Sequence, residues 1–357
     1  MTNSTSALQA IDKESLIKPL MQHCMQFKGG ETGRSIFQIT TTISLFAVAC
    51  ALMIVLVRSN SYWALPVLWL FAGGLLVRIF IFQHDCGHMS FFKTRKANDR
   101  VGRALSVLTV TPYAFWRDAH NMHHAASGNL EGRGIGSIDT VTVSEYQKMS
   151  NKDKFFYRLY RNPLVTLVVG PPLHVMFIQR IPTTVLTNFF ADYKSISFKK
   201  AWPSIMGLNL ALVLFYGSLS LLFGAKAVAL TFVMPIAIAA WAGGWLFYIQ
   251  HQFEDAYWEK KPEWNFQEAA VLGSSYYKLP KIMQWFTGNI GLHHIHHLCS
   301  LIPNYKLQEC MDAHEPLKTI NVMTFRDSLK SIRLALWDEA RQKMISFKDY
   351  KTLYPAT

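Results

Sequence analysis

The sequence is poor in charge and in cysteine, and both shortages narrow the classes of protein it can represent. Charged residues make up 17% of the 357 residues, against roughly 25% in a typical soluble domain. The five cysteines are odd in number and form no CxxC motif, so they indicate neither a disulfide framework nor a cysteine-rich zinc site. The first forty residues lack the basic and apolar segments of a cleavable signal peptide. These features favour a reducing location that faces the cytoplasm.

Apolar and basic residues are abundant instead. Hydrophobic residues make up 50% of the chain and aromatic residues 13%, which is enough to bury a large core and excludes intrinsic disorder. The mean hydropathy of +0.13 is lower than we expect for a transporter that lies almost wholly within the membrane. The composition therefore predicts membrane spans combined with substantial aqueous parts.

Four apolar segments are long enough to cross a bilayer, which needs about 20 residues per helix. They cover residues 36–57, 63–82, 205–223 and 227–249. Very short links join the members of each pair, so we expect an all-α integral membrane protein with four transmembrane helices in two hairpins and a helical cytoplasmic cap. Buried core helices of a soluble protein are the alternative. The shorter runs 104–116 and 164–178 are interrupted by prolines and are predicted to lie on the membrane or dip into it.

The basic residues predict the orientation of these spans. Of the 36 lysine and arginine residues, 33 lie in 1–40, 83–203 and 250–357, and positive charge is retained on the cytoplasmic side of membranes. Long loops also carry solvated charge for ordinary reasons. We expect both termini and both large regions to be cytoplasmic, and we interpret the net charge of +13 as a bias of one membrane face, not as a sign of nucleic-acid binding. The predicted organisation has five parts: a cytoplasmic segment 1–35, hairpin 36–82, cytoplasmic region 83–204, hairpin 205–249 and cytoplasmic region 250–357.

Histidines form the most informative pattern. Nine of the 13 fall in three clusters, HDCGH at 84–88, HNMHH at 120–124 and HHIHH at 293–297. Spacings of three and four place side chains on one helix face, which leaves His294 pointing away. Neutral imidazole is a common ligand of iron, zinc and copper, and because a single zinc takes three or four ligands, eight converging rings suit two ions. The eight are His84, His88, His120, His123, His124, His293, His296 and His297.

The positions of the clusters agree with a shared site. Two clusters follow the second span and one follows the fourth, so four spans bring all three to the same side of the membrane. A fifth span at 164–178 would separate them, which argues against that span. No HExxH motif of a zinc peptidase occurs. Three further histidines, His23, His174 and His314, have no partners in the sequence and are interpreted as structural or surface residues.

These motifs resemble the three histidine boxes of the membrane fatty acid desaturases, in their acyl-lipid omega-6 or Δ12-type branch. The similarity covers roughly residues 35–310 and includes the segments 84–102, 108–134 and 247–258. It implies a non-haem di-iron enzyme of the bacterial inner membrane that uses O₂ and two electrons to place a cis double bond in a long, lipid-linked acyl chain. It also implies that His251 is a ninth metal ligand.

Carboxylates within the same motifs are candidates to support the ligands, because a metal-bound histidine usually donates its other N–H to a carboxylate or carbonyl. They are Asp85, Asp118, Glu254 and Asp255. Ordinary solvated charge is the alternative for each of them.

The electrons are expected to come from another protein. The sequence contains no HPGG haem motif, no cysteine set for an iron–sulfur cluster and no GxGxxG, so the resemblance implies a separate ferredoxin or cytochrome b5-like donor. Such donors are usually acidic, and a basic cytoplasmic face suits their docking.

Two other functions fit parts of the pattern. Relatives with similar boxes hydroxylate or ketolate alkyl chains and carotenoids. A non-catalytic membrane metal-binding protein or transporter is the second alternative. A transporter should bury ionisable residues within its spans, whereas Arg78 is the only charged residue within the four predicted spans.

Overall fold

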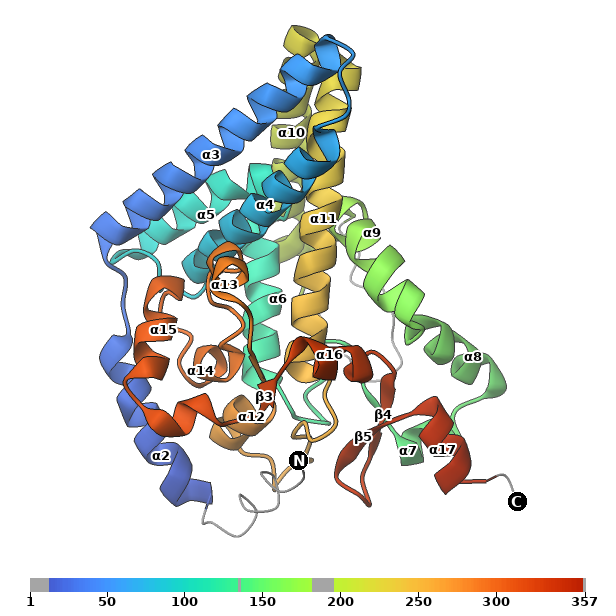
Figure 1. Ribbon diagram of the computed structural model, residues 1–357. Coiled ribbons are helices and arrows are strands. Elements are labelled where there is room, and N and C mark those ends of the chain that lie inside the picture. The colour runs from blue at the N-terminus through green and yellow to red at the C-terminus, as the bar shows by residue number, and fades with distance from the viewer. Residues whose placement is uncertain (1–12, 134–135, 182–195, 356–357) are drawn as a thin grey trace.

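The structure is a computed structural model that describes residues 13–133, 136–181 and 196–355. Most of these residues are helical. Figure 1 shows long helices that project from one end of a broader body, which is built from short helices and two small sheets.

Four helices are long and apolar enough to cross a membrane, which confirms the prediction from the sequence. They are α3 (Thr32–Arg58), α4 (Leu65–Gly87), α10 (Phe198–Phe223) and α11 (Ala225–His251). Residues 59–64 link α3 to α4, and Gly224 alone links α10 to α11. The φ angle of Gly224 is +92°, a conformation that is open to glycine because it has no Cβ.

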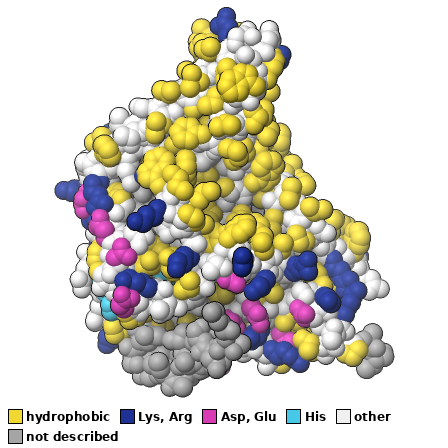
Figure 2. Space-filling view, viewed as in Figure 1, with side chains coloured by type: hydrophobic (Ala, Val, Ile, Leu, Met, Phe, Trp, Pro, Cys, Tyr) yellow, Lys and Arg dark blue, Asp and Glu magenta, His cyan; other side chains and the backbone are white. Residues whose placement is uncertain are grey.

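The helix α4 lies at the centre of the molecule and contacts α3, α5 and α11. Its side chains Leu75, Ile79 and Phe82 are fully buried in the largest apolar cluster. The helix α10 is different, since Val213 and Leu221 expose 69% and 91% of their surface. Large apolar surfaces of this kind mark contact with a membrane or a partner, and Figure 2 shows them along the projecting helices.

Shorter helices connect α4 to α10. The predicted run 104–116 is divided between two of them, because Val110 adopts a left-handed φ of +49° and Pro112 precedes the next helix. The run 164–178 forms a π-helical turn and a short helix, and together these are too short for a span. The helices are α5 (Arg95–Thr109), α6 (Tyr113–Ala126), α7 (Val143–Lys148), α8 (Asn151–Tyr160), η2 (Leu164–Val169), α9 (Gly170–Met176) and η3 (Ile178–Arg180).

The rest of the body comes from the two ends of the chain. An N-terminal helix, α2 (Lys13–Cys24), and the short η1 (Met25–Phe27) lie against helices of the C-terminal region. The helices of the C-terminal region are α12 (Phe266–Leu272), α13 (Lys281–Phe286), α14 (His293–Leu298), α15 (Asn304–Asp312), η4 (Glu315–Lys318), α16 (Phe325–Ser331) and α17 (Phe347–Leu353), of which α12, α14 and α15 contact α2 or η1.

Two small sheets, which the all-α prediction did not include, connect distant parts of this body. In the first, β1 (Val141–Thr142) pairs parallel with β4 (Leu334–Asp338), and β4 pairs antiparallel with β5 (Lys343–Ser346). In the second, β2 (Tyr276–Tyr277) pairs parallel with β3 (Val322–Met323). Four of the five strands contain at most four residues, so they lack the alternation by which a strand is recognised in a sequence.

Candidate metal centre

The first histidine box lies at the C-terminal end of α4. His84 and Asp85 occupy the last turn of the helix, and His88 follows it directly. All three are buried, and the ring centroids of His84 and His88 are 4.7 Å apart. Because α4 is held by α3, α5 and α11, the position of this box is fixed by the packing of the long helices.

The other histidines approach this box from three further helices. The second box is on α6, the third box forms α14, and His251 is the last residue of α11. All nine histidines that were predicted to meet do so, in two groups whose ring nitrogens lie within 4.8 Å of one another. The five-histidine group contains His84, His88, His120, His124 and His296, and the four-histidine group contains His123, His251, His293 and His297.

The second and third boxes contribute to both groups. His120 and His124 are four residues apart on α6 and enter the five-histidine group, whereas His123 enters the other. Successive residues of an α-helix are rotated by about 100°, so His123 is turned away from His124. The stacked rings of His124 and His297, with centroids 4.0 Å apart, lie where the two groups meet.

The ring nitrogens within each group are close enough to share a cation. In the four-histidine group, Nε2 of His251 is 3.1 Å from Nε2 of His123 and 3.0 Å from Nε2 of His293. In the five-histidine group, Nε2 of His124 is 3.2 Å from Nε2 of His120 and 3.0 Å from Nε2 of His296. A neutral imidazole has one donor and one acceptor nitrogen, so a metal ion can satisfy several of these nitrogens at once.

Burial keeps the rings in the neutral form that binds metals. Desolvation, reinforced by neighbouring histidines, lowers the pKa of His88, His123 and His297 well below the ordinary imidazole value. The same causes lower the pKa of the other box-two and box-three members of the groups, His120, His124, His293 and His296.

Unpaired nitrogens indicate that the groups fit a metal. Nε2 of His88, Nε2 of His297 and Nδ1 of His293 are buried without a hydrogen-bond partner. Each such buried polar atom costs about 1–3 kcal/mol. A metal bound by the Nε2 atoms would remove that cost for His88 and His297.

Several of the histidine rings are oriented by hydrogen bonds at Nδ1. Nδ1 of His84 is 3.1 Å from Oδ1 of Asp85, and Oδ2 of Asp85 accepts bonds from the backbone and side-chain N–H groups of Asn304 at 2.7 and 2.9 Å. In the four-histidine group, Nδ1 of His123 is 3.2 Å from the Ser137 hydroxyl, and Nδ1 of His251 is 3.0 Å from the Gly273 carbonyl oxygen. Of these partners, the sequence pointed only to Asp85.

The other three candidate carboxylates form ion pairs with basic side chains. Asp118 pairs with Arg117 at 3.2 Å, and Lys343 pairs with Glu254 at 3.1 Å and with Asp255 at 3.4 Å. Their exposed or half-exposed side chains fit the alternative of ordinary solvated charge.

The remaining histidines lie outside the two groups. His294 is directed to the Leu317 carbonyl oxygen at 2.9 Å, as expected for the member of box three that points away. His23 stacks on His314 with ring centroids 4.6 Å apart. His174 is on α9, where burial lowers its pKa.

The four-histidine group borders a pocket. The lining of this pocket includes His123, His251, Ser137, Arg133 and Trp258, and it contains no member of the five-histidine group. Beside the five-histidine group, the half-buried Trp116 stacks on His120 with centroids 4.7 Å apart and an interplanar angle of 16°.

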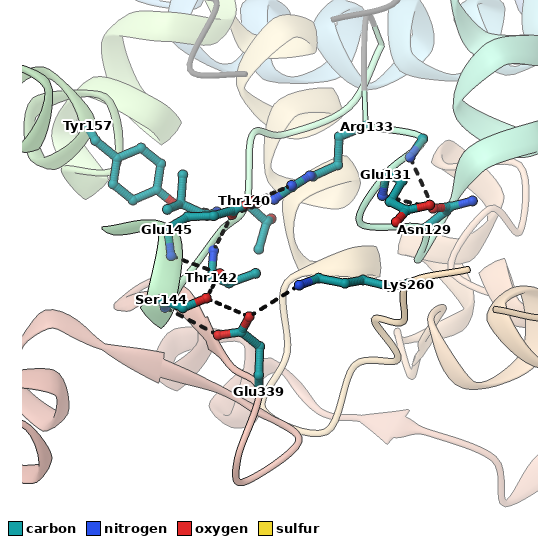
Figure 3. Close-up of polar contacts among 12 residues, drawn as sticks. Asn129, Glu131, Arg133, Thr140, Thr142, Ser144, Glu145, Tyr157, Lys260 and Glu339 are labelled. Atoms are coloured by element: carbon teal, nitrogen blue, oxygen red, sulfur yellow. Dashed lines mark hydrogen bonds and ion pairs between the residues drawn. The ribbon is translucent and has the colours of Figure 1, made fainter. Parts of the chain in front are cut away.

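An ion-pair network holds the loop that carries Ser137 and Arg133. Both Nη atoms of Arg133 donate to the Glu145 carboxylate, at 2.9 and 2.6 Å, and Nη1 also donates to the Thr140 carbonyl oxygen. Figure 3 shows this pair and, next to it, Glu339, which accepts bonds from Ser144 and lies 3.8 Å from Nζ of Lys260. The network therefore joins the pocket to α7 and to the turn after β4.

Comparison with known proteins identifies the family of this chain. The model of the fatty acid desaturase family matches residues 61–325, a range that includes all three boxes and His251. The chain belongs to this family. A fatty acid desaturase of Bacillus subtilis is 40% identical over 334 residues, which cover 94% of this chain and 92% of that protein.

More distant relatives carry more detailed names. An sn-1 oleoyl-lipid 12-desaturase of Synechocystis is 24% identical, with 89% of this chain and 84% of the relative covered. An sn-1 acyl-lipid omega-3 desaturase (ferredoxin) of Nostoc is 26% identical, with 82% and 76% covered. This chain is an integral membrane oxidoreductase of the fatty acid desaturase family, with a histidine-rich site that can bind metal.

Proposed function

We propose that the two histidine groups each hold one iron ion and that the enzyme places a cis double bond in the acyl chain of a membrane lipid. The observation that carries this proposal is the convergence of nine imidazoles in two groups. The overall change is the conversion of –CH₂–CH₂– to –CH=CH–, in which O₂, two electrons and two protons give two molecules of water.

Iron suits the donor set and the chemistry. Imidazole binds zinc, copper and iron, but zinc has no redox change to offer. Iron bound here would supply the oxidising power that removes two hydrogens from an unactivated chain. The nine ligands proposed are the five- and four-histidine groups, His251 included.

The residues of the chain place and protect this chemistry. Asp85 and Asn304 fix the His84 ring, and Ser137 and the Gly273 carbonyl fix two rings of the other group. Burial of the boxes excludes water, which protects a reactive oxidant. An acyl chain that approaches the site along the apolar faces of the long helices gains about 0.8 kcal/mol for each CH₂ that it buries.

The electron donor, the bond position and the location complete the proposal. We assign a ferredoxin or cytochrome b5-like donor, in line with the ferredoxin named for the Nostoc relative. We assign the Δ12 or omega-6 position, in line with the name of the Synechocystis relative. The lysine and arginine bias supports a site on the cytoplasmic side, with both termini, and we assign the bacterial inner membrane.

The test is expression in a host whose lipids contain only saturated and mono-unsaturated chains, with a reductant system supplied. Mass spectrometry of the fatty acid methyl esters should show a new double bond at carbon 12 of oleoyl chains, and the purified protein should contain iron. A hydroxylated product would support the hydroxylase alternative, and zinc without iron or product would support the non-catalytic one. Either result would overturn the proposal, as would full activity in His293→Ala.

A further inference from the structure

Three segments outside the four long helices expose apolar side chains while they lie against those helices. They are α13, the continuous segment η2–α9, and α16, and we refer to them together as the collar. The sequence assigned α13 and α16 to the aqueous side, and it assigned η2–α9 to a segment that lies on the membrane or dips into it. Their contacts with α4 and α11 show how far along the long helices each one reaches.

The segment α13 follows α4 well into its apolar length. The ring of Phe286 is 6.0 Å from that of Phe71, and it fills the space where a Cβ on Gly74 would lie, at 2.7 Å. Phe71 lies 13 residues before His84, or about 20 Å along the helix axis. Because α4 needs about 20 residues to cross a bilayer, Phe71 and Gly74 lie within the crossing part.

Arg78 binds α13 to this position. Its Nη1 donates to the Trp285 carbonyl oxygen, its guanidinium lies 4.4 Å from the centroid of the Trp285 ring, and its Nε donates to the Thr42 hydroxyl at 3.3 Å. An arginine inside a membrane span is costly unless it is paired within the protein. Arg78 is 6% exposed and finds its partners in α13 and α3.

The other two segments meet α11 at the corresponding level. Nε1 of Trp241 donates to the Val168 carbonyl oxygen in η2 at 2.6 Å, and Pro171 of α9 fills the space beside Gly244. The ring of Phe325 in α16 lies 6.4 Å from that of Trp245. Twenty residues counted from the start of α11 end at Gly244, so these contacts mark the inner boundary of the crossing part.

The outward faces of the collar are apolar and are bordered by basic residues. Ile282 and Phe325 expose 62% and 60% of their surface, and Leu164 exposes 67%. Lys281 begins α13 and is exposed, and Lys330 in the last turn of α16 is exposed and pairs with Asp327 at 3.3 Å. Figure 2 shows apolar side chains along the projecting helices and on the adjoining part of the broader body, with many Lys and Arg side chains lower on the body.

We infer that the collar is embedded in the phospholipid bilayer, with α13 as a re-entrant segment beside α4 and with η2–α9 and α16 at the boundary. The acyl chains of the lipid cover Ile282, Leu164 and Phe325, and the phosphate groups pair with the bordering lysines, which extend towards them. The collar fixes the depth of the histidine groups, which begin six residues beyond Arg78 on α4 and six beyond Trp245 on α11.

The test measures the depth of nitroxide spin labels in the full chain, reconstituted in vesicles of phosphatidylcholine and phosphatidylglycerol. The single substitutions are Ile282→Cys, Leu164→Cys and Phe325→Cys, at exposed positions where folding is undisturbed. All five native cysteines are buried, and labelling of the unsubstituted chain gives the background. Leu214→Cys, on the exposed face of α10, is the embedded control, and Lys348→Cys, exposed on α17, is the aqueous control.

Each collar label should be several-fold more accessible to O₂ than to a water-soluble nickel chelate, as the label at 214 will be. The label at 348 should show the reverse. A collar label that behaves like the label at 348 would overturn the inference. The measurement does not depend on catalysis, so its failure is separate from failure of the proposed function.

Discussion

The two histidine groups share two helices but differ in what surrounds them. The five-histidine group is anchored by a buried carboxylate, Asp85, and covered by Trp116. The four-histidine group is held by neutral oxygens, those of Ser137 and Gly273, and borders a pocket. A carboxylate makes an imidazole a stronger ligand than a neutral acceptor does. The proposed metal positions are therefore not equivalent, and we expect the one in the five-histidine group to hold its iron more firmly.

The largest expected effect comes from removing a ligand of the four-histidine group. His293→Ala leaves this group with three imidazoles, and we expect iron content to fall by about half and desaturation by a hundredfold or more, since losing a ligand should exceed the roughly 10–100-fold cost of losing an outer partner. The adjacent His294→Ala is the matched control, because His294 bonds to Leu317 outside the groups. Equal iron loss in both variants would contradict the assignment.

Removing the Asp85 carboxylate should reverse the order in which the two groups release iron to a chelator. Asp85→Asn takes the anion from His84 and sets an amide against the Asn304 amide, so we expect the five-histidine group to lose roughly 10–100-fold in iron affinity. Titration with an iron chelator should then show its iron leaving no later than that of the four-histidine group. Asp118→Asn is the control. Because Asp118 pairs with Arg117, this variant should leave the titration unchanged. An unaltered titration of Asp85→Asn would show that the anchor is not the carboxylate.

A smaller change should follow from Ser137→Ala. The variant removes one neutral hydrogen bond to His123, worth about 0.5–1.5 kcal/mol, so the four-histidine group should release iron about 2- to 10-fold more readily. The chelator titration used for Asp85→Asn measures this release of iron. Ser106→Ala is the control, because the hydroxyl of that buried serine bonds only to the nearby Arg103 carbonyl oxygen. A loss confined to the five-histidine group would be evidence against the placement of Ser137.

The smallest expected effect concerns the loop beside the pocket. Partial burial alone would raise the pKa of Glu145, but Arg133 and the hydrogen bonds from Thr142 together outweigh it and hold this pKa below the ordinary value. The stabilisation is therefore present above the unfolded pKa of about 4.3 and is lost as the pH falls through the folded pKa.

Glu145→Gln should destabilise the protein near neutral pH by about 1 kcal/mol, because the Glu145 side chain is about a third exposed and the pair is partly screened. Thermal unfolding in detergent, at neutral pH and again below pH 4, measures both the loss and its disappearance in acid. A difference between variant and wild type that grows as the pH falls would contradict the expected direction of the pKa shift.

The features that could be predicted from the sequence are those carried by short, continuous stretches of the chain. Four runs of about 20 apolar residues predict four helices, and spacings of three and four residues predict converging histidines, including the outward turn of His294. His251 was assigned as a ligand through the family resemblance, because a single histidine forms no repeating pattern. The division of the second box between two groups was not predictable, because it depends on how α6 faces α4 and α11.

Other features have no signal in the sequence at all. The partner of His251 is the backbone oxygen of Gly273, an atom that every residue possesses. Ser137 and Asn304 are ordinary polar residues until the fold brings them to His123 and Asp85. The depth of α13 is set by Phe71, Gly74 and Arg78 on another helix, so its six residues alone indicate only a short helix.

The bond between Asp85 and Asn304 also bears on how the enzyme is made. These residues are 219 positions apart, and ribosomes add roughly 5–20 residues per second, so the first box waits roughly 10 to 45 seconds for its anchor to be synthesised. During that interval the first hairpin can insert into the membrane while its histidines have neither Asn304 nor His296 beside them. The proposed firm binding of metal in the five-histidine group is therefore a late event in the life of each chain, after synthesis has passed Asn304.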